Sequence, residues 1–305
     1  MPAATIFTST IANDLQDTLE EIIVDRTDGL EARLDMPKFM DVRRTKSAFV
    51  DMLEVGGLGV AVSVGEGEEI PARGISEGAL TRLWVRKFGL RTMATEEALA
   101  DGKTDKVINA ARRLKRAIWK AVDIDAAQVL NRATNTDFPG GDGQPLASAA
   151  HTLPGGGTYS NMVATPTAPS EAAYVLARAQ ADVQVDLDGV IDGVEIEGVA
   201  FPIGQRGAWE VLSFSDRSPQ AGQYNAVNLI NRDKIKLVPV RHWTASEVDY
   251  CWLTDHPDEK LCWYWRERPS SRTWVSEARD VMNYSVKARW ARGWSGGRGI
   301  LYNQG

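Results

Sequence analysis

One short stretch of the sequence matches a pattern that positions a catalytic serine. Residues 74–78 read Gly-Ile-Ser-Glu-Gly, the spacing of a hydrolase nucleophile elbow with Ser76 as the nucleophile. Such an elbow needs a buried strand before the serine and a helix after it. Residues 68–73 are instead charged and contain Pro71, which does not suit a buried strand. A glycine-flanked loop is the favoured interpretation, and a serine hydrolase around Ser76 stays as an alternative.

Nucleotide and metal sites find less support. Residues 102–104 end like a phosphate-binding loop, but Glu97 stands where that motif requires a glycine. Residues 57–59 begin like a dinucleotide fingerprint, but Val62 occupies the position of its third glycine. The three histidines lie far apart in the sequence, and none has a second histidine at ligand spacing. The sequence therefore predicts no cofactor and no metal.

The ten tryptophans raise the possibility of sugar binding, because aromatic rings stack on sugars. Trp252, Trp263 and Trp265 would lie with Tyr250 on one face of a hairpin predicted over residues 250–265. Aromatic pairs across strands ordinarily hold sheets together, so packing in a core is the favoured interpretation. An aromatic sugar-binding module remains a third hypothesis.

Composition excludes several classes of protein. The chain has 305 residues with 35 Lys and Arg against 41 Asp and Glu, a formal net charge of −6. A general nucleic-acid binder would have a basic surplus, and no apolar run approaches the length of a membrane span. The first residues do not resemble a secretory signal. Cys251 and Cys262 would face each other in the predicted hairpin, yet we expect both to stay reduced in a chain made in the cytosol.

The first part of the chain contains segments that cannot form a core of their own. Residues 1–47 read as an arm, with a helix predicted over residues 11–24. Residues 48–86 read as a long projecting β-hairpin rich in glycine and charge. Its tip, residues 65–69, is Gly-Glu-Gly-Glu-Glu, where glycine supplies the positive φ angles of a turn.

A long helix is the clearest single element. Residues 104–132 contain no helix breaker, and apolar residues recur at helical spacing along one face. Basic residues cover much of the other face, and a solvated surface is the favoured interpretation of them over a nucleic-acid patch. Residues 135–169 are rich in Gly, Pro, Ser and Thr and predict a loop. A second helix capped by Ser170, a small α/β unit and a strand-rich last third follow.

The order of these parts resembles the major capsid protein of tailed bacteriophages, the Hong Kong 97 fold. Residues 142–151 are similar to the "DGxxLFSxxHP" loop of the Mu-type major head subunit family, with Ala147 and Thr152 departing from its Phe and Pro. Residues 156–161 are similar to the loop that follows in that family. Residues 224–228, which precede a returning strand at 235–239, and residues 284–289 and 293–299 are also similar to that family.

This resemblance implies an α+β fold divided into named parts. These are an N-terminal arm (1–47), an extended hairpin or E-loop (48–86), a peripheral domain (87–159, with the spine helix over 104–132), an axial domain (160–235) and a returning peripheral sheet (236–305). The expected function is a structural, non-enzymatic head protein that self-assembles into pentamers and hexamers. These would form an icosahedral shell around phage DNA, and assembly would take place in the cytoplasm of the host bacterium.

The resemblance also implies partners and contact residues. Copies of the chain are the first partner; a scaffold, a portal and a cement protein are further ones. The packaged DNA would meet the inner face without sequence-specific binding, and no membrane is involved. The candidate contacts between subunits lie on the E-loop: Gly57, Gly65, Glu66, Gly67, Glu68, Glu69 and Arg73. The competing readings remain the hydrolase around Ser76 and an aromatic-rich sugar-binding virion module.

Some capsids of this fold are cross-linked through a lysine on the projecting loop. Between Lys46 and Lys87 this sequence has no lysine. Arginine stays protonated and does not substitute as a nucleophile. We therefore expect a shell without such covalent links.

Overall fold

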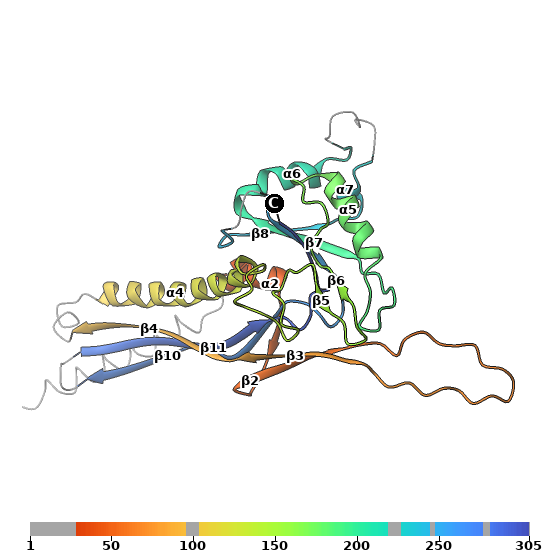
Figure 1. Cartoon of the computed structure of the whole chain (residues 1–305). Helices are drawn as coiled ribbons and strands as arrows, with labels where there is room; N and C mark the ends of the chain where they lie inside the picture. Colours follow the sequence, from red (N-terminus) through yellow and green to blue (C-terminus); the bar gives the residue numbers. More distant parts are fainter. Residues whose placement is uncertain (1–28, 96–103, 219–226, 245–247, 277–280, 305) are drawn as a thin grey trace, which may run out of the picture.

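The computed structural model describes residues 29–95, 104–218, 227–244, 248–276 and 281–304. Figure 1 shows a body of two sheet-and-helix units, with one loop projecting far from it. The helix predicted over residues 11–24 lies outside the described residues.

The longer unit is a sheet with strand order β1-β10-β11-β4. Its strands are β1 (Asp41–Arg44), β10 (Cys262–Ser276), β11 (Val281–Gly293) and β4 (Arg86–Thr95). β10, β11 and β4 are antiparallel neighbours, whereas β1 pairs with β10 in parallel. β1 follows the short helices η1 (Glu31–Arg33) and α2 (Met36–Phe39). The helix α4 (Thr104–Asn131) runs beside this sheet in Figure 1, and its 28 residues span about 42 Å.

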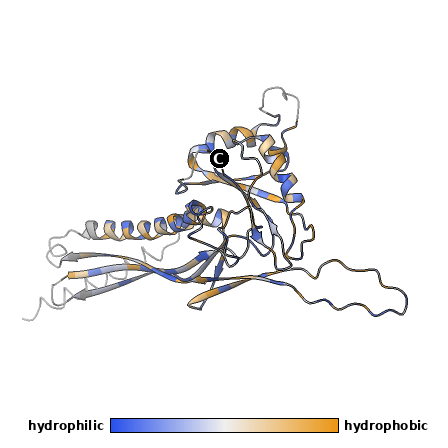
Figure 2. Cartoon of the chain, in the orientation of Figure 1, coloured by the Kyte–Doolittle hydropathy of each residue, from blue (hydrophilic) through white to orange (hydrophobic). Residues whose placement is uncertain are grey.

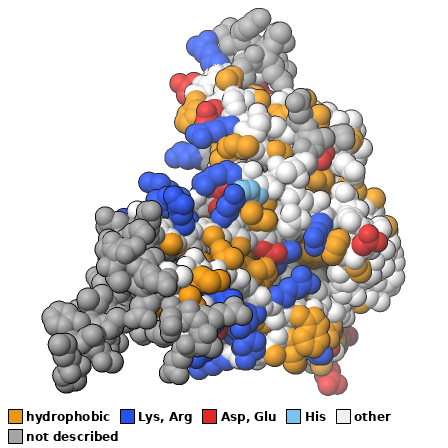
Figure 3. All heavy atoms as spheres, turned by 90° about the vertical axis from the view of Figure 1, so that its left-hand side faces the viewer, with side chains coloured by type: hydrophobic (Ala, Val, Ile, Leu, Met, Phe, Trp, Pro, Cys, Tyr) orange, Lys and Arg blue, Asp and Glu red, His pale blue; other side chains and the backbone are white. Residues whose placement is uncertain are grey.

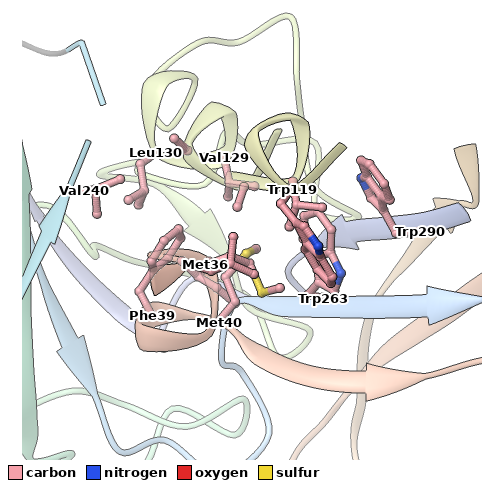
Figure 4. Packing of buried hydrophobic residues seen from close by; sticks show 14 of the residues in the cluster. Met36, Phe39, Met40, Trp119, Val129, Leu130, Val240, Trp263 and Trp290 are labelled. Carbon is pink, nitrogen blue, oxygen red and sulfur yellow. The ribbon is translucent and has the colours of Figure 1, made fainter. Parts of the chain in front are cut away.

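An aromatic core joins α4 to the sheet. The ring of Trp119 on α4 lies edge-on to Trp265, with ring centroids 6.1 Å apart. Trp290 of β11 stacks on Phe88 of β4 at 3.9 Å. Figure 4 shows Trp263 beside Trp119 of α4 and toward Met36 of α2, and Trp290 belongs to the same core. Because truncating such a buried ring to alanine typically costs about 3–5 kcal/mol, these contacts hold the helix on the sheet.

The second unit has strand order β12-β9-β7-β8. Its strands are β7 (Ile196–Pro202), β8 (Lys236–Val240), β9 (Tyr250–Thr254) and β12 (Ile300–Asn303). Its helices are α5 (Glu171–Asp182), α6 (Arg206–Phe214) and α7 (Leu229–Arg232), with η2 (Ile203–Gln205) leading into α6. Ser170 caps α5 by accepting a hydrogen bond from the backbone of Ala173, as its position in the sequence predicts. One face of this sheet packs against these helices, and the other face belongs to the core that contains α4.

The predicted hairpin over residues 250–265 is wrong. β9 joins the sheet of β7 and β12, whereas β10 joins the sheet of β1 and β11. Trp252 accordingly packs against Trp209 in one core, while Trp263 and Trp265 pack in the other. The segment between the strands carries the chain from one sheet to the next. A period of two residues indicates strands, but it does not distinguish a hairpin from strands of two separate sheets.

The expected boundary at residue 235 falls within the second sheet. β7 comes before it in the sequence, and β8, β9 and β12 come after it. These four strands are hydrogen-bonded into one sheet, whereas the boundary expected from the sequence divides them between two domains.

The E-loop (residues 48–86) is paired only at its base. β2 (Phe49–Val55) pairs with β3 (Glu77–Trp84) as antiparallel neighbours. Residues 56–76, which we call the outer E-loop, contain no strand and project to the right in Figure 1. The hydropathy colours of Figure 2 show apolar and polar residues along this segment, away from both cores.

Candidate assembly surfaces

The predicted contact residues lie on the outer E-loop, where nearly every residue is exposed. At the tip, the backbone N–H of Glu68 donates to the carbonyl of Gly65, and the Glu68 carboxylate accepts from the backbone N–H of Gly65. Gly67 has a φ of 85°, which favours glycine. Glu66 and Glu69 are exposed on either side, so the tip presents three carboxylates to solvent.

The other two predicted residues lie nearer the root of the loop. The guanidinium of Arg73 crosses to the opposite limb, where a Cβ on Gly59 would lie 2.7 Å from Arg73 Nη1. Gly57 faces Asp186, which follows α5 of the second unit, since a Cβ there would lie 3.5 Å from Asp186 Oδ2. The structure thus separates the seven residues into an acidic tip and a root that lies beside the second unit.

The base of the E-loop has one buried and one exposed face. Met52 and Leu83 pack against β10 and β11 in a small separate cluster. The opposite face exposes Phe49, Leu53, Leu80 and Trp84, with Trp84 62% exposed. Between them Arg82 forms a bidentate ion pair with Asp51, at 2.7 and 2.8 Å. This exposed face is not among the sites expected from the sequence, although the alternation of apolar residues along both strands could have indicated it.

A buried charge cluster lies where the E-loop meets the body. Arg298 is buried and forms an ion pair with the buried Glu259. Glu54 of β2 is also buried, and its carboxylate accepts a hydrogen bond from the backbone N–H of Ala79 at 3.4 Å. Burial, with a smaller contribution from the charge of Glu259, raises the pKa of Glu54 to about 7. The root of the loop therefore contains a carboxyl group that titrates near neutral pH.

The loop that resembles the Mu-type family (residues 142–151) follows a direct contact with this root, in which the backbone N–H of Gly141 donates to the Thr81 hydroxyl at 2.9 Å. His151 Nδ1 lies 2.6 Å from Asp142 Oδ2, and the two side chains are buried together. The Asn161 side chain accepts from the backbone N–H of Ser148 and donates to the carbonyls of Leu146 and Gly297. These bonds tie the loop to the chain segment that precedes β12. The spacing of His151, Asp142 and Asn161 in the sequence did not indicate that their side chains hold this loop in place.

The face of the long sheet that points away from α4 is basic. Lys87 pairs in register with Arg289, and Gly89 pairs with Lys287. Arg91 and Arg272 both pair with Ser285, one from each side. Glu267 is the acid within this group; its ion pair with Lys287, at 2.9 Å, is the main cause that lowers its pKa. We call the five cations Lys87, Arg91, Arg272, Lys287 and Arg289 the basic sheet face.

Charge is divided unevenly along the chain. β4, α4, β10 and β11 together contain fifteen Lys and Arg but only four Asp and Glu. The rest of the chain has 20 Lys and Arg against 37 Asp and Glu. A chain that is acidic overall therefore carries one strongly basic unit, which its net charge conceals.

The described residues do not assemble an enzyme site around Ser76. Its hydroxyl has no hydrogen-bond partner, and the residues before it belong to the strandless outer E-loop, with a strand following instead of a helix. The rings proposed to bind sugar are fully buried at Trp252 and Trp263 and nearly so at Trp265, so they offer no platform. Among the described residues, no group of three or more His, Cys, Asp or Glu could hold a metal ion.

Comparison with known proteins identifies the family. The model of a family described as phage capsid protein matches residues 85–303. The chain belongs to this family. It is a structural capsid protein and has its place in the shell of a virion, together with copies of itself. No curated protein matches the chain.

Solved structures show that the capsid fold extends over nearly the whole chain. A structure from Microbacterium phage Oxtober96 is 12% identical, with a TM-score of 0.53 over 92% of this chain and 99% of that chain. A virus-like particle from Pyrococcus furiosus is 9% identical, with a TM-score of 0.55 over 94% and 98%. The capsid of a native GTA particle is 13% identical, with a TM-score of 0.51 over 89% and 90%. The expected α+β fold of the Hong Kong 97 type is confirmed.

Within the described residues, no helix combines the length and the apolarity that crossing a membrane would require.

Proposed function

We propose that this capsid protein assembles into pentamers and hexamers that close an icosahedral shell around phage DNA, and that each outer E-loop lies across a second copy. The role is structural, and no catalytic step is part of it. The observation that carries the proposal is the outer E-loop, an ordered acidic turn on a long exposed segment with no core of its own.

Such a segment is costly unless a partner covers it. Fixing the backbone of each residue costs about 1–2 kcal/mol of conformational entropy. Val60, Val62 and Ile70 are at least half exposed, so they bury little apolar surface in return. Contact with a neighbouring copy would bury these side chains and offset the entropy.

Charge complementarity supports the basic sheet face as the acceptor. The tip contributes Glu66, Glu68 and Glu69, and the acceptor contributes five cations with one intervening acid, Glu267. The E-loop base of the same chain already covers one end of that sheet face through Met52 and Leu83. An exposed ion pair is worth only about 0.2–1 kcal/mol, so each contact is weak and errors of assembly can be reversed.

The second unit supplies the contacts around the capsomer axis in this proposal. Val211 and Phe214 of α6 are 62% and 78% exposed, and Val175 and Leu176 of α5 are about half exposed. Exposed apolar side chains gathered on one unit favour contact with another protein surface. The axial domain then comprises α5 to α7 together with the sheet of β7, β8, β9 and β12. The arm, the E-loop and the first peripheral segment (87–159) keep the boundaries expected from the sequence, and the returning peripheral sheet is reduced to β10 and β11.

Reversal of charge tests the contact between copies. The tip variant E66K/E68K/E69K and the acceptor variant K87E/R91E/R289E should each abolish shell formation, as measured by sedimentation and electron microscopy. The combined variant has the wild-type net charge and should restore shells, because the attraction returns with opposite signs. Restoration is the decisive result. If both single-surface variants assemble normally, the tip does not dock on this face.

Further partners belong to the same proposal. A closed shell needs a portal for DNA entry, and a scaffold and a cement protein would guide and stabilise it. Assembly would take place in the cytoplasm of the host bacterium. Purifying shells from host cells and identifying the proteins that remain bound would test these partners directly.

A further inference from the structure

The exposed face of α4 carries a line of cations. Arg112, Arg113, Arg116 and Lys120 are all exposed, and we call them the α4 ridge. None of the four has an ion-pair or hydrogen-bond partner among the described residues. Other exposed cations do have one: Arg206 pairs with Glu210 at 2.6 Å.

Like charges at this spacing destabilise a helix. Arg112 and Arg116 are four residues apart, and so are Arg116 and Lys120. Each such like-charged pair costs about 0.2–0.5 kcal/mol. The described acids of α4 have partners other than the ridge. Asp123 accepts hydrogen bonds from the backbone N–H groups of Asp35 and Met36 at the start of α2. Asp125 accepts a hydrogen bond from Trp290 and forms an ion pair with Arg292. The ridge therefore has the form of a surface whose counter-charge comes from outside the described residues.

The ridge and the basic sheet face lie on opposite sides of one layer. Val286, Ala288 and Trp290 of β11 belong to the core with α4. Because side chains alternate along a strand, Lys287 and Arg289 point to the opposite side. Figure 1 shows α4 running along one side of the sheet. A shell has one outer and one inner surface, so these two basic surfaces meet different partners.

The groove beside the ridge extends the positive charge toward the sheet edge. Arg113 of α4 lines this groove, and Leu90 and Leu114 contribute apolar surface. Arg91 belongs to the sheet face and borders the groove only at the edge strand β4. The end-on view of Figure 3 shows Lys and Arg side chains spread over this end of the molecule with few Asp or Glu side chains between them.

We infer that the α4 ridge faces the interior of the shell and binds the phosphate backbone of the packaged double-stranded DNA. This inference rests on the proposed function, in which the E-loop of a second copy takes the sheet face. Four-residue steps along α4 separate the cations by about 6 Å, close to two phosphate steps of one DNA strand at about 3.4 Å each. A regular line of unpaired arginines fits a regular polyanion, and contacts to phosphate alone carry no sequence preference.

Cross-linking of DNA-filled particles tests the inference without any substitution. Formaldehyde joins exposed lysine amines to nearby bases; nuclease digestion and mass spectrometry then locate the nucleotide adducts. Lys120 on the ridge and Lys87 on the sheet face are exposed lysines on opposite sides of the layer. We expect an adduct yield roughly tenfold or more higher at Lys120, because the far side of the layer lies beyond the reach of a screened phosphate. Equal yields, or a higher yield at Lys87, would overturn the inference.

Two variants sharpen the result. K120R keeps the charge but removes the reactive amine, so the Lys120 adduct should disappear while packaging is unchanged. R112Q/R113Q/R116Q keeps the amine but removes the neighbouring charges, and the Lys120 adduct should fall roughly threefold or more because fewer phosphates are held beside it. An unchanged yield in this triple variant would show that the arginines do not hold DNA.

The outcomes separate this inference from the proposed function. If the chain forms no shells, the proposed function fails. If shells form and contain DNA but Lys120 carries no nucleotide, only the ridge assignment fails. Cross-links from Lys120 to peptides of another protein would also overturn it, in favour of an acidic protein partner such as a scaffold.

Discussion

The outer E-loop and the unit of α4 with the long sheet differ in almost every physical property. The loop is exposed, acidic and strandless between residues 56 and 76. The sheet unit has fully buried tryptophans such as Trp263, and its surface is basic. One region is stable within the chain, while in the proposed function the other is covered by a second copy. A shell subunit needs both, because a rigid body defines the wall and an adaptable segment joins neighbouring copies.

Deleting the outer E-loop should have the largest effect on assembly. Replacing residues 57–75 by a short turn removes little packing, so the free energy of unfolding of the subunit should change by less than about 1 kcal/mol. Shells should be absent, because the proposed function requires the tip to dock on a second copy. Urea unfolding and electron microscopy measure the two effects. Closed shells formed by the deletion variant would mean that the outer E-loop does not join neighbouring copies.

A core substitution should act in the opposite way. Trp290→Ala removes a buried ring that stacks on Phe88 and donates a hydrogen bond to Asp125 at 2.8 Å. We expect a loss of about 3–5 kcal/mol in the free energy of unfolding, measured by urea denaturation of the subunit. Trp84→Ala, at an exposed tryptophan of the E-loop base, is the control and should cost under about 1 kcal/mol. Equal losses would mean that the two regions do not differ in packing.

The root of the E-loop should respond to pH through Glu54. Its folded pKa is raised from 4.5 to about 7, so between these values the native state binds more protons than the unfolded chain. Stability should therefore fall as the pH rises through this window, by at most about 3 kcal/mol from this group. Glu54→Gln keeps the shape without the charge and should remove that part of the pH dependence. Unfolding curves of the wild type and of Glu54→Gln, each recorded at pH 5 and pH 8, measure this effect. If the free energy of unfolding changes equally with pH in both proteins, the prediction is wrong.

The smallest expected effect is on covalent structure. The E-loop has no lysine between Lys46 and Lys87, so we expect no lysine-derived cross-link between copies. Boiling purified shells in detergent should release a single band of 33.5 kDa. Multimers that resist a reductant would contradict this and would point to Lys46 or Lys87. The free, buried Cys251 and Cys262 should remain two titratable thiols after denaturation.

Local patterns predicted the elements whose causes are local. The apolar stripe and the absence of breakers predicted a helix over residues 104–132, and the structure has α4 over Thr104–Asn131. Ser170 predicted a helix start because a cap depends on bonds within one turn. Gly65 and Gly67 likewise predicted a turn at the tip. Each inference needed only neighbours a few residues apart.

Inferences that depended on distant residues failed or were missed. The hairpin over residues 250–265 was expected because its strands are adjacent in sequence, yet each strand pairs with a different sheet. The basic sheet face arises from β4, which ends at Thr95, and from β10 and β11, which begin only at Cys262. The ion pair of Glu259 with Arg298 could not be read from spacing either, because nothing local indicates that both are buried.

By itself the sequence determined α4, the start of α5, the turn at the loop tip, the acidic charge of that tip and the kind of protein that the order of parts resembles. These follow from periodicity, backbone preferences and residue type, all of which act along the chain. Only the tertiary structure decided which strands pair, that Glu54 is buried at the loop root, and that the basic residues form two surfaces on opposite sides of one layer. Those features depend on burial and on contacts between segments far apart in sequence, and such contacts exist only once the chain has folded.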